Sequence, residues 1–167
     1  KIKVDRISGG YKKVRNKILE QFSDNEIYKK KWFILGGLTG SGKTVLLNNF
    51  QQAIDIESIA NHRGSAFGRT NTKQPSCANF ENKLAFHYMN NKCSNILLED
   101  ESKTIGKATL PKNWYDKMQT SDLIVMDIKT EERVQNIVNE YITLALDQIK
   151  TPSLLRDNYL TALEKIQ

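Results

Sequence analysis

The segment Gly37–Thr44 has the pattern G-x-x-x-x-G-K-[ST], which is that of a phosphate-binding loop. In such a loop the glycines let backbone N–H groups face an anion, the lysine reaches terminal phosphate oxygens, and the final hydroxyl can hold Mg²⁺. The motif requires a strand before it and a helix after it, and the apolar run Trp32–Leu35 and the helical pattern from Val45 meet both requirements. We therefore expect the chain to bind a ligand that carries phosphate. The loop residues expected to bind it are Gly37, Leu38, Thr39, Gly40, Ser41, Gly42, Lys43 and Thr44.

Short apolar runs that alternate with helical patterns predict an α/β domain, a P-loop NTPase-like three-layer sandwich with a mainly parallel sheet. In this architecture the ligand binds at the carboxyl ends of the strands. The expected strands are Trp32–Leu35, Gln52–Ile56, Ile96–Leu98 and Leu123–Asp127. The expected helices include Phe80–Met89, Trp114–Met118, one that Thr130 caps and that continues to Ile142, and Leu154–Ile166. Residues 61–80 and 103–112 are expected to be loops.

The positive charge of the chain is concentrated at its N-terminal end. The 167 residues carry a net charge of +6, and residues 1–31 hold ten Lys/Arg against four Asp/Glu, so the remainder is neutral overall. This asymmetry favours nucleic acid as a partner, although a solvated helix face would give the same pattern. We expect a basic linker and helix over residues 1–31, a P-loop domain over residues 32–150 and a C-terminal helix over residues 151–167.

No apolar run approaches the ~20 residues that a transmembrane helix needs, and the chain shows no signal-peptide pattern. The two cysteines, Cys77 and Cys93, lack C-x-x-C spacing, which argues against a disulfide scaffold or a zinc site. These observations predict a cytoplasmic location and no membrane partner.

Three consecutive acids, Glu99–Glu101, come directly after the apolar run Ile96–Leu98. A carboxylate in this position is the usual partner that holds hydrated Mg²⁺ near a P-loop. Any of the three acids could face the ligand, and we take Glu99 and Asp100, together with the hydroxyl of Thr44, as the candidate Mg²⁺ ligands. The alternative is that these acids form a capping turn for the next segment.

A second pair of acids, Asp55 and Glu57, lies at the exit of the predicted strand Gln52–Ile56. Asp55 is placed to act as an acceptor or general base, and the alternative is an N-cap for the residues that follow. A polar, glycine-containing stretch comes next. Within it Arg63 can clamp a phosphate bidentately and His62 can titrate near neutral pH. With Lys43 of the loop, these give the catalytic candidates Lys43, Asp55, His62 and Arg63.

Three further side chains are candidates for ligand binding. Phe67 could stack on a base or pack on an apolar group, and Gln74 is a weaker candidate. Arg133 could cover a nucleotide base or form an ion pair with Glu131 or Glu132, and the sequence favours the ion pair.

Several segments occur in an order that resembles one family. They are Gly9–Lys12, Gly36–Thr44, Asn61–Gly68, Gln74–Ser76, Phe80–Glu81, Glu99–Ser102, Glu131–Val134 and Glu140–Tyr141. Together they resemble the C-terminal P-loop domain of bacterial tRNA 2-selenouridine synthases over residues 9–142. The His-Arg-Gly-Ser and Glu-Asp-Glu-Ser segments carry the specificity, because the P-loop alone occurs widely. The resemblance adds Ser65 to the candidate ligand-binding residues.

The resemblance implies a two-step transferase that modifies the wobble base of tRNA. A geranyl group passes from geranyl diphosphate to the sulfur of 2-thiouridine, and selenium from selenophosphate then replaces the S-geranyl group. Both donors carry phosphate, so the loop need not bind ATP or GTP, although either remains possible. The family also has a rhodanese-like domain with a cysteine used in the selenium step. Nothing here resembles that domain, so residues 1–8 would be its tail or the following linker, and the selenium step would need the rhodanese-like domain of the full-length protein.

Two other functions fit parts of the sequence. A small-molecule or nucleoside kinase would use the same loop and acids, but residues 103–118 contain lysines and no arginine, unlike the Arg-rich lid of such kinases. A nucleotide-gated RNA-binding module would bind tRNA without changing it.

Overall fold

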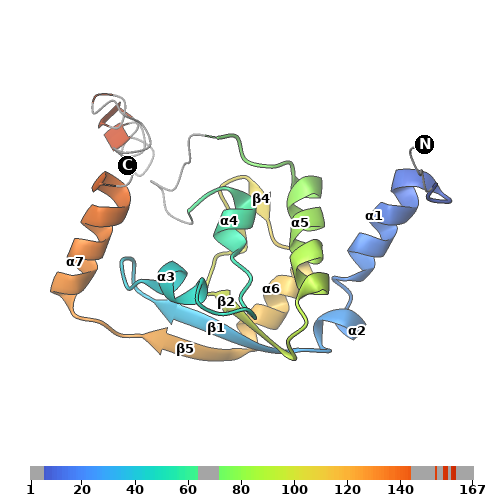
Figure 1. Cartoon of the computed structure of the whole chain (residues 1–167), viewed down its shortest axis with the longest axis horizontal. Coiled ribbons are helices and arrows are strands. Elements are labelled where there is room, and N and C mark those ends of the chain that lie inside the picture. The colour runs from blue at the N-terminus through green and yellow to red at the C-terminus, as the bar shows by residue number, and fades with distance from the viewer. Residues whose placement is uncertain (1–5, 64–71, 144–152, 154–155, 158, 161–167) are drawn as a thin grey trace, which may run out of the picture.

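The computed structural model describes residues 6–63, 72–143, 153, 156–157 and 159–160 (Figure 1). The first half contains α1 (Gly10–Glu20), α2 (Asp24–Ile27), β1 (Lys31–Gly37), α3 (Lys43–Leu47), α4 (Ile56–Ala60) and α5 (Cys77–Asn90). The second half contains β2 (Asn95–Glu99), β3 (Thr104–Ile105), β4 (Ala108–Thr109), α6 (Lys112–Gln119), β5 (Asp122–Met126), α7 (Thr130–Val138) and the π-helical turn η1 (Asn139–Thr143).

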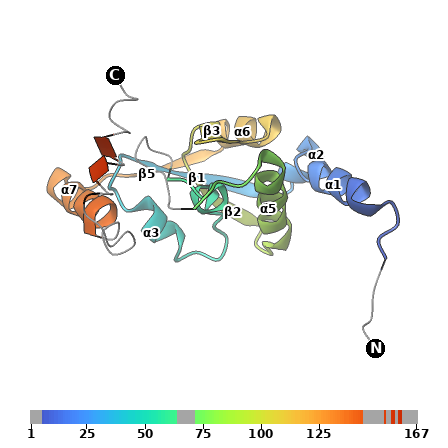
Figure 2. The same cartoon turned by 90° about the horizontal axis from the view of Figure 1, so that it is seen from above.

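The main sheet has the strand order β2-β1-β5, and both pairings are parallel. Figure 2 shows helices on both sides of the sheet, with α3 on one side and α6 on the other. Leu35 of β1 is level with Glu99 at the end of β2, and Gly37 is level with Met126 at the end of β5. The P-loop therefore leaves the central strand at the carboxyl edge of the sheet. These features confirm the predicted P-loop NTPase-like α/β fold with a parallel sheet.

The core is built around a group of aromatic side chains on one side of β1. The rings of Trp32 and Trp114 are 4.5 Å apart, and Phe22 and Tyr88 both meet the ring of Trp114 edge-on. Contacts between aromatic rings in this geometry stabilise the fold beyond the free energy gained by burying the apolar surface of the rings. On the other side, buried Leu47 of α3 packs against Leu35 and Leu97 of the sheet. This small cluster holds α3, and with it the end of the P-loop, on the sheet.

The short strand expected within Gln52–Ile56 is reduced to one residue pair beside β2. The segment makes a single parallel bridge, Ala53 with Leu97, and the chain then enters α4. The reason is local, because the Asp55 side chain accepts a hydrogen bond from the N–H of Ser58 and so starts a helix where the strand was expected to end.

Three further boundaries differ from the sequence predictions. The region 103–112 contains the hairpin β3–β4, and α5 begins at Cys77 instead of Phe80. The cap of α5 is Ser76, whose Oγ accepts from the N–H of Asn79. The N-cap of α7 is Lys129, so Thr130 is the first helical residue and not the cap. The predicted helix Leu154–Ile166 lies largely outside the described residues.

The strand β5 is apolar but exposed. An unbroken apolar run is typical of a parallel strand that is buried on both faces. Here β5 lies at an edge of the sheet, and Leu123, Ile124 and Val125 are 57%, 48% and 63% exposed. Because successive residues of a strand face opposite sides, neither face of β5 is fully covered.

The basic N-terminal region is docked on the domain through α1. Arg15 forms an ion pair with Glu81 of α5 and donates to Asn82 Oδ1 at 2.6 Å. The charge of Arg15 is thus used within the domain, and the role of the other basic residues in tRNA binding stays a prediction. None of the helices in the described ranges has the length and apolar character needed to cross a membrane.

Candidate functional site

A cleft of about 1070 Å³ lies at the carboxyl edge of the sheet. Its wall is formed by the P-loop and α3, by α4 and the residues after it, by the acidic segment that follows β2, and by α7 with η1. The site residues predicted from sequence that line it are Gly37, Thr39, Gly40, Ser41, Gly42, Lys43, Thr44, Asp55, His62, Arg63, Glu99 and Asp100. The structure therefore brings together most of the predicted site from three separate parts of the chain.

The P-loop is closed on itself in this structure. The ammonium of Lys43 donates to the carbonyl of Gly37 at 2.7 Å, and the N–H of Ser41 donates to the carbonyl of Leu38 at 3.1 Å. The first turn of α3 follows directly, and the N–H groups of a first helical turn have no carbonyl partner within the helix. The oxygens of a phosphate group that enters the loop would thus replace the carbonyl oxygen of Gly37 as the acceptor of the hydrogen bond from Lys43 Nζ.

Helix α7 holds the tip of the P-loop from outside. Arg133 Nε donates to the carbonyl of Thr39 at 3.0 Å, and Asn136 Nδ2 donates to the carbonyl of Gly40 at 2.8 Å. No ion pair joins Arg133 to Glu131 or Glu132 in the described part of the chain, because residues one or two apart do not face each other on a helix. The predicted ion pair is therefore wrong, and Arg133 supports the loop instead.

We expect Asn136→Ala to weaken binding of a diphosphate ligand about fivefold. The substitution removes one neutral hydrogen bond to the loop carbonyl of Gly40, and such a bond contributes on the order of 1 kcal/mol. Gln135→Ala is the matched control, because Gln135 lies on the same helix and bonds to Asn139 rather than to the loop. Calorimetric titration measures both variants, and equal affinities would show that α7 does not hold the loop in its binding conformation.

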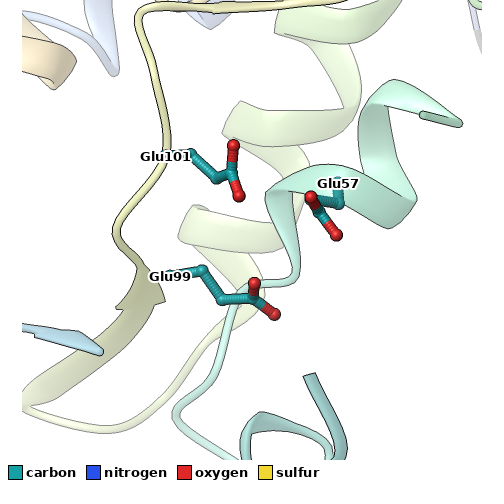
Figure 3. A group of neighbouring side chains, drawn as sticks. All are labelled: Glu57, Glu99 and Glu101. Atoms are coloured by element: carbon teal, nitrogen blue, oxygen red, sulfur yellow. The ribbon is translucent and has the colours of Figure 1, made fainter. Parts of the chain in front are cut away.

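Three glutamates converge on one side of the cleft (Figure 3). Glu57 lies on α4, Glu99 ends β2, and Glu101 follows two residues later; their carboxylates offer oxygens that all lie within 4.8 Å of one another. Asp100, predicted as a Mg²⁺ ligand, is not part of this group, because successive residues of an extended segment face opposite sides. Its Oδ2 lies instead toward Gly36, 3.7 Å from where a Cβ would stand there.

The electrostatics of this group are set by burial. Glu99 is only 2% exposed, and burial raises its pKa from 4.5 to about 7, against the opposing effects of a hydrogen bond with Thr44 and the charge of Lys43. Burial also raises the pKa of Glu101, and the charge and hydrogen bond of Glu57 raise it further. Burial and mutual repulsion therefore disfavour the ionised forms of Glu99 and Glu101, and a nearby cation would favour them.

Two predicted catalytic residues, Asp55 and His62, lie in the wall of the cleft. Asp55 lines the cleft but also caps α4, so the capping alternative considered from sequence is observed. His62 lines the cleft too, and its buried Nδ1 has no hydrogen-bond partner among the described residues.

The remaining predicted binding residues lie in different places. Gln74 donates to the carbonyls of Ala60 and Ile105 and accepts from the N–H of Lys107, so its amide ties α4 to the β3–β4 hairpin outside the cleft. Leu38 is exposed at the tip of the loop and also lies outside the cleft lining. Ser65 and Phe67 lie outside the described residues.

Sequence reasoning did not assign Glu57 or Glu101 to the metal site. A usable signal existed for Glu101, because residues two apart in an extended segment share a face with each other. No comparable signal existed for Glu57, which reaches the group only through the position of α4 beside β2.

Unsatisfied polar atoms mark the cleft as a ligand site. Five buried side-chain N or O atoms of the described residues have no hydrogen-bond partner, and three of them are Ser41 Oγ, His62 Nδ1 and Glu99 Oε1. All three residues line the same cleft. Since buried polar groups are nearly always paired in folded proteins, a concentration of unpaired ones points to a ligand or ion that pairs with them.

Comparison with known proteins agrees with this geometry. Residues 30–167 match the family model described as the tRNA 2-selenouridine synthase AAA domain. The chain belongs to this family. The resemblance seen in the sequence is thereby confirmed, and it covers the P-loop, the acidic segment after β2 and α7. No solved structure matches the chain.

Individual tRNA 2-selenouridine synthases are similar over most of the chain. The protein of Sulfurovum sp. (strain NBC37-1) is 39% identical over 148 residues, which cover 87% of this chain and 40% of the relative. Those of Shewanella pealeana and Shewanella woodyi are 43% and 41% identical, over 81% and 84% of this chain and 38% and 39% of the relatives. The chain thus spans about two fifths of the length of the curated relatives it matches.

Proposed function

We propose that this chain is the phosphate-binding transferase domain of a tRNA 2-selenouridine synthase, and that it modifies the wobble uridine of tRNA with geranyl diphosphate and selenophosphate as co-substrates. The observation that carries the proposal is the P-loop with Lys43 beside the buried carboxylate of Glu99, in a chain that belongs to this family. The family supplies the tRNA reaction, and the P-loop supplies a place for a donor that carries phosphate.

In the geranyl step the C–O bond of geranyl diphosphate breaks, the sulfur of 2-thiouridine gains the geranyl group, and diphosphate leaves. The domain must stabilise the negative charge that develops on the leaving diphosphate. Lys43 is positioned for this, because its ammonium already lies at the loop carbonyl of Gly37. Arg63, on the other wall of the cleft, is placed to contact a second phosphate group.

Thr44 and Glu99 fit a Mg²⁺ ion. Thr44 lies at the end of the loop and Glu99 at the end of β2, both line the cleft, and Glu99 Oε1 is buried without a partner among the described residues. When bound, Mg²⁺ would neutralise charge on the diphosphate as it leaves. The two side chains would hold the ion close to the phosphate loop, where both of them line the cleft.

The other parts of the proposed enzyme concern tRNA and the selenium step. The basic region before β1 would contact the tRNA backbone, with affinity that falls as salt concentration rises. The selenium step would use a rhodanese-like domain of the full-length protein. A cytoplasmic location, where tRNA is modified, fits this function.

Calorimetric titration with geranyl diphosphate and with ATP, each with Mg²⁺, tests the proposal. We expect geranyl diphosphate to bind more tightly than ATP, and Lys43→Ala to weaken its binding about 100-fold, because a charge-assisted bond to phosphate is lost. Lys83→Ala, an exposed lysine on α5, is the charge-matched control. A preference for ATP, with turnover to a phosphorylated nucleoside, would overturn the proposal in favour of a kinase.

A further inference from the structure

We propose that Glu57, Glu99 and Glu101 form a site for a hard divalent cation that is separate from the phosphate loop and fills without any phosphate ligand. This inference goes beyond the proposed function, because it concerns binding of a metal ion by three carboxylates of the protein alone. The proposed function assigns Mg²⁺ only to Thr44 and Glu99, together with the phosphates of the substrate.

The geometry of the three carboxylates suits a cation. One oxygen from each lies within 4.8 Å of the others, and the three side chains come from α4, the end of β2 and the segment after it (Figure 3). Oxygen ligands at ~2.0–2.6 Å from a Mg²⁺ or Ca²⁺ ion stand roughly 3–5 Å from each other. The spacing observed without a cation is therefore already close to that of a coordination shell.

A second observation, independent of the clustering, is the unpaired oxygen of Glu99. Glu99 is 2% exposed, and its Oε1 has no hydrogen-bond partner in the described part of the chain. A buried carboxylate oxygen without a partner is costly, and buried charges are normally paired or coordinate a metal ion. The bonds of the Lys43 ammonium in the described part of the chain go to the carbonyls of Gly37 and Leu38, and no ion pair joins it to Glu99 there.

The donor set indicates which cation fits. All three donors are carboxylate oxygens, and no cysteine lines the cleft. Oxygen-only sites favour Mg²⁺, Mn²⁺ or Ca²⁺, whereas zinc sites favour His and Cys. Because Thr44 and the three glutamates line one cleft, a cation held here would lie near one held at the phosphate loop.

The competing explanation is a shared proton. The carboxyl groups of Glu57 and Glu101 lie close together, so a proton held between them would also relieve their repulsion. A cation would displace this proton and satisfy all three groups together. The two explanations differ in whether the metal-free chain takes up a divalent cation near neutral pH.

Titration of the chain with Mn²⁺ alone, followed by electron paramagnetic resonance and calorimetry at pH 7.5, distinguishes them. We expect one Mn²⁺ per chain in the wild type, and at least tenfold weaker binding in Glu57→Gln and in Glu101→Gln. Asp100→Asn is the matched control, because it removes a neighbouring carboxylate outside the group. Circular dichroism confirms that each variant is folded. No Mn²⁺ uptake by the wild type at millimolar concentration, or equal loss in Asp100→Asn, would overturn the site.

Lys43→Ala separates this site from the proposed function. If both proposals hold, this variant loses geranyl diphosphate binding and still binds Mn²⁺. If the wild type binds Mn²⁺ at the three glutamates but binds no diphosphate, the metal site stands and the proposed function fails. If the wild type binds diphosphate but takes up no Mn²⁺ on its own, the metal site fails and the proposed function stands.

Discussion

Gly40→Ala is expected to lower the affinity for geranyl diphosphate by about 100-fold or more. Gly40 has a φ of +80°, and a Cβ at this position would lie 2.5 Å from the backbone oxygen of Arg133 and 2.7 Å from Ile137 Cγ1. The left-handed backbone alone costs an alanine roughly 1–2 kcal/mol. The overlap with a backbone atom of α7 adds to this, because neither the loop nor the helix can move without breaking the bonds that join them.

A matched control isolates the contact with α7. Gly10 also has a positive φ, of +56°, but a Cβ there would meet nothing within 4 Å. Gly10→Ala therefore carries the conformational cost of an alanine in a left-handed backbone, but no steric overlap. Gly10 also lies outside the cleft lining. We expect it to lower the melting temperature slightly and to leave the dissociation constant unchanged. Wild-type affinity in Gly40→Ala would contradict the tight packing of the loop tip against α7.

The stability of the metal-free chain is expected to fall as pH rises from about 4.5 to 7. Glu99 has a pKa of about 7 in the folded chain against 4.5 in the unfolded state, so the folded chain holds a proton that the unfolded chain releases in this range. Protonated Glu99 therefore makes its full contribution to the stability of the folded chain below pH 4.5, and this contribution is lost as the pH rises through 7. The shift corresponds to on the order of 3 kcal/mol in the free energy of unfolding.

The charged groups around Glu99 act in both directions. Glu57 and Asp55 raise its pKa and Lys43 lowers it, while the raised pKa of Glu101 adds to the loss of stability over a similar range. Urea unfolding in the presence of a chelator, measured from pH 4.5 to 8, checks the prediction.

Glu99→Gln provides the decisive comparison, because glutamine keeps the shape of the side chain and removes its titration. We expect this variant to be more stable than the wild type at pH 8 and to show a smaller pH dependence. Asp100→Asn, which changes the exposed neighbour, should retain the wild-type dependence. An equal pH dependence in the wild type and Glu99→Gln would mean that Glu99 is not the titrating group.

The parts of the site that could be predicted from sequence are those in which the chemistry is local. The glycines, Lys43 and Thr44 are contiguous, and the apolar run before them identifies the strand that positions them. Glu99 could be predicted for the same reason, because it directly follows an apolar strand. The P-loop, the parallel sheet and the family resemblance rest on such short segments.

Predictions failed where a local pattern allowed two structures. Asp55 ends a short apolar stretch, which fits a strand, but its side chain also caps a helix, and the cap prevails in the structure. The ion pair expected for Arg133 failed because its neighbours in sequence are not its neighbours on the helix surface. The strand expected at Leu123–Asp127 is present as β5, and its position at the sheet edge leaves its apolar side chains exposed.

Contacts between distant segments follow from the arrangement of the elements and not from any one segment. The strand order β2-β1-β5 places the acids after β2 and the helix after β5 on either side of the P-loop. That arrangement lets Arg133 and Asn136 hold the loop and brings Glu57 of α4 to Glu99 and Glu101. Residues 42 or more positions apart meet only when the chain has packed, because sheet order and helix direction, rather than local propensity, determine which side chains share a cleft.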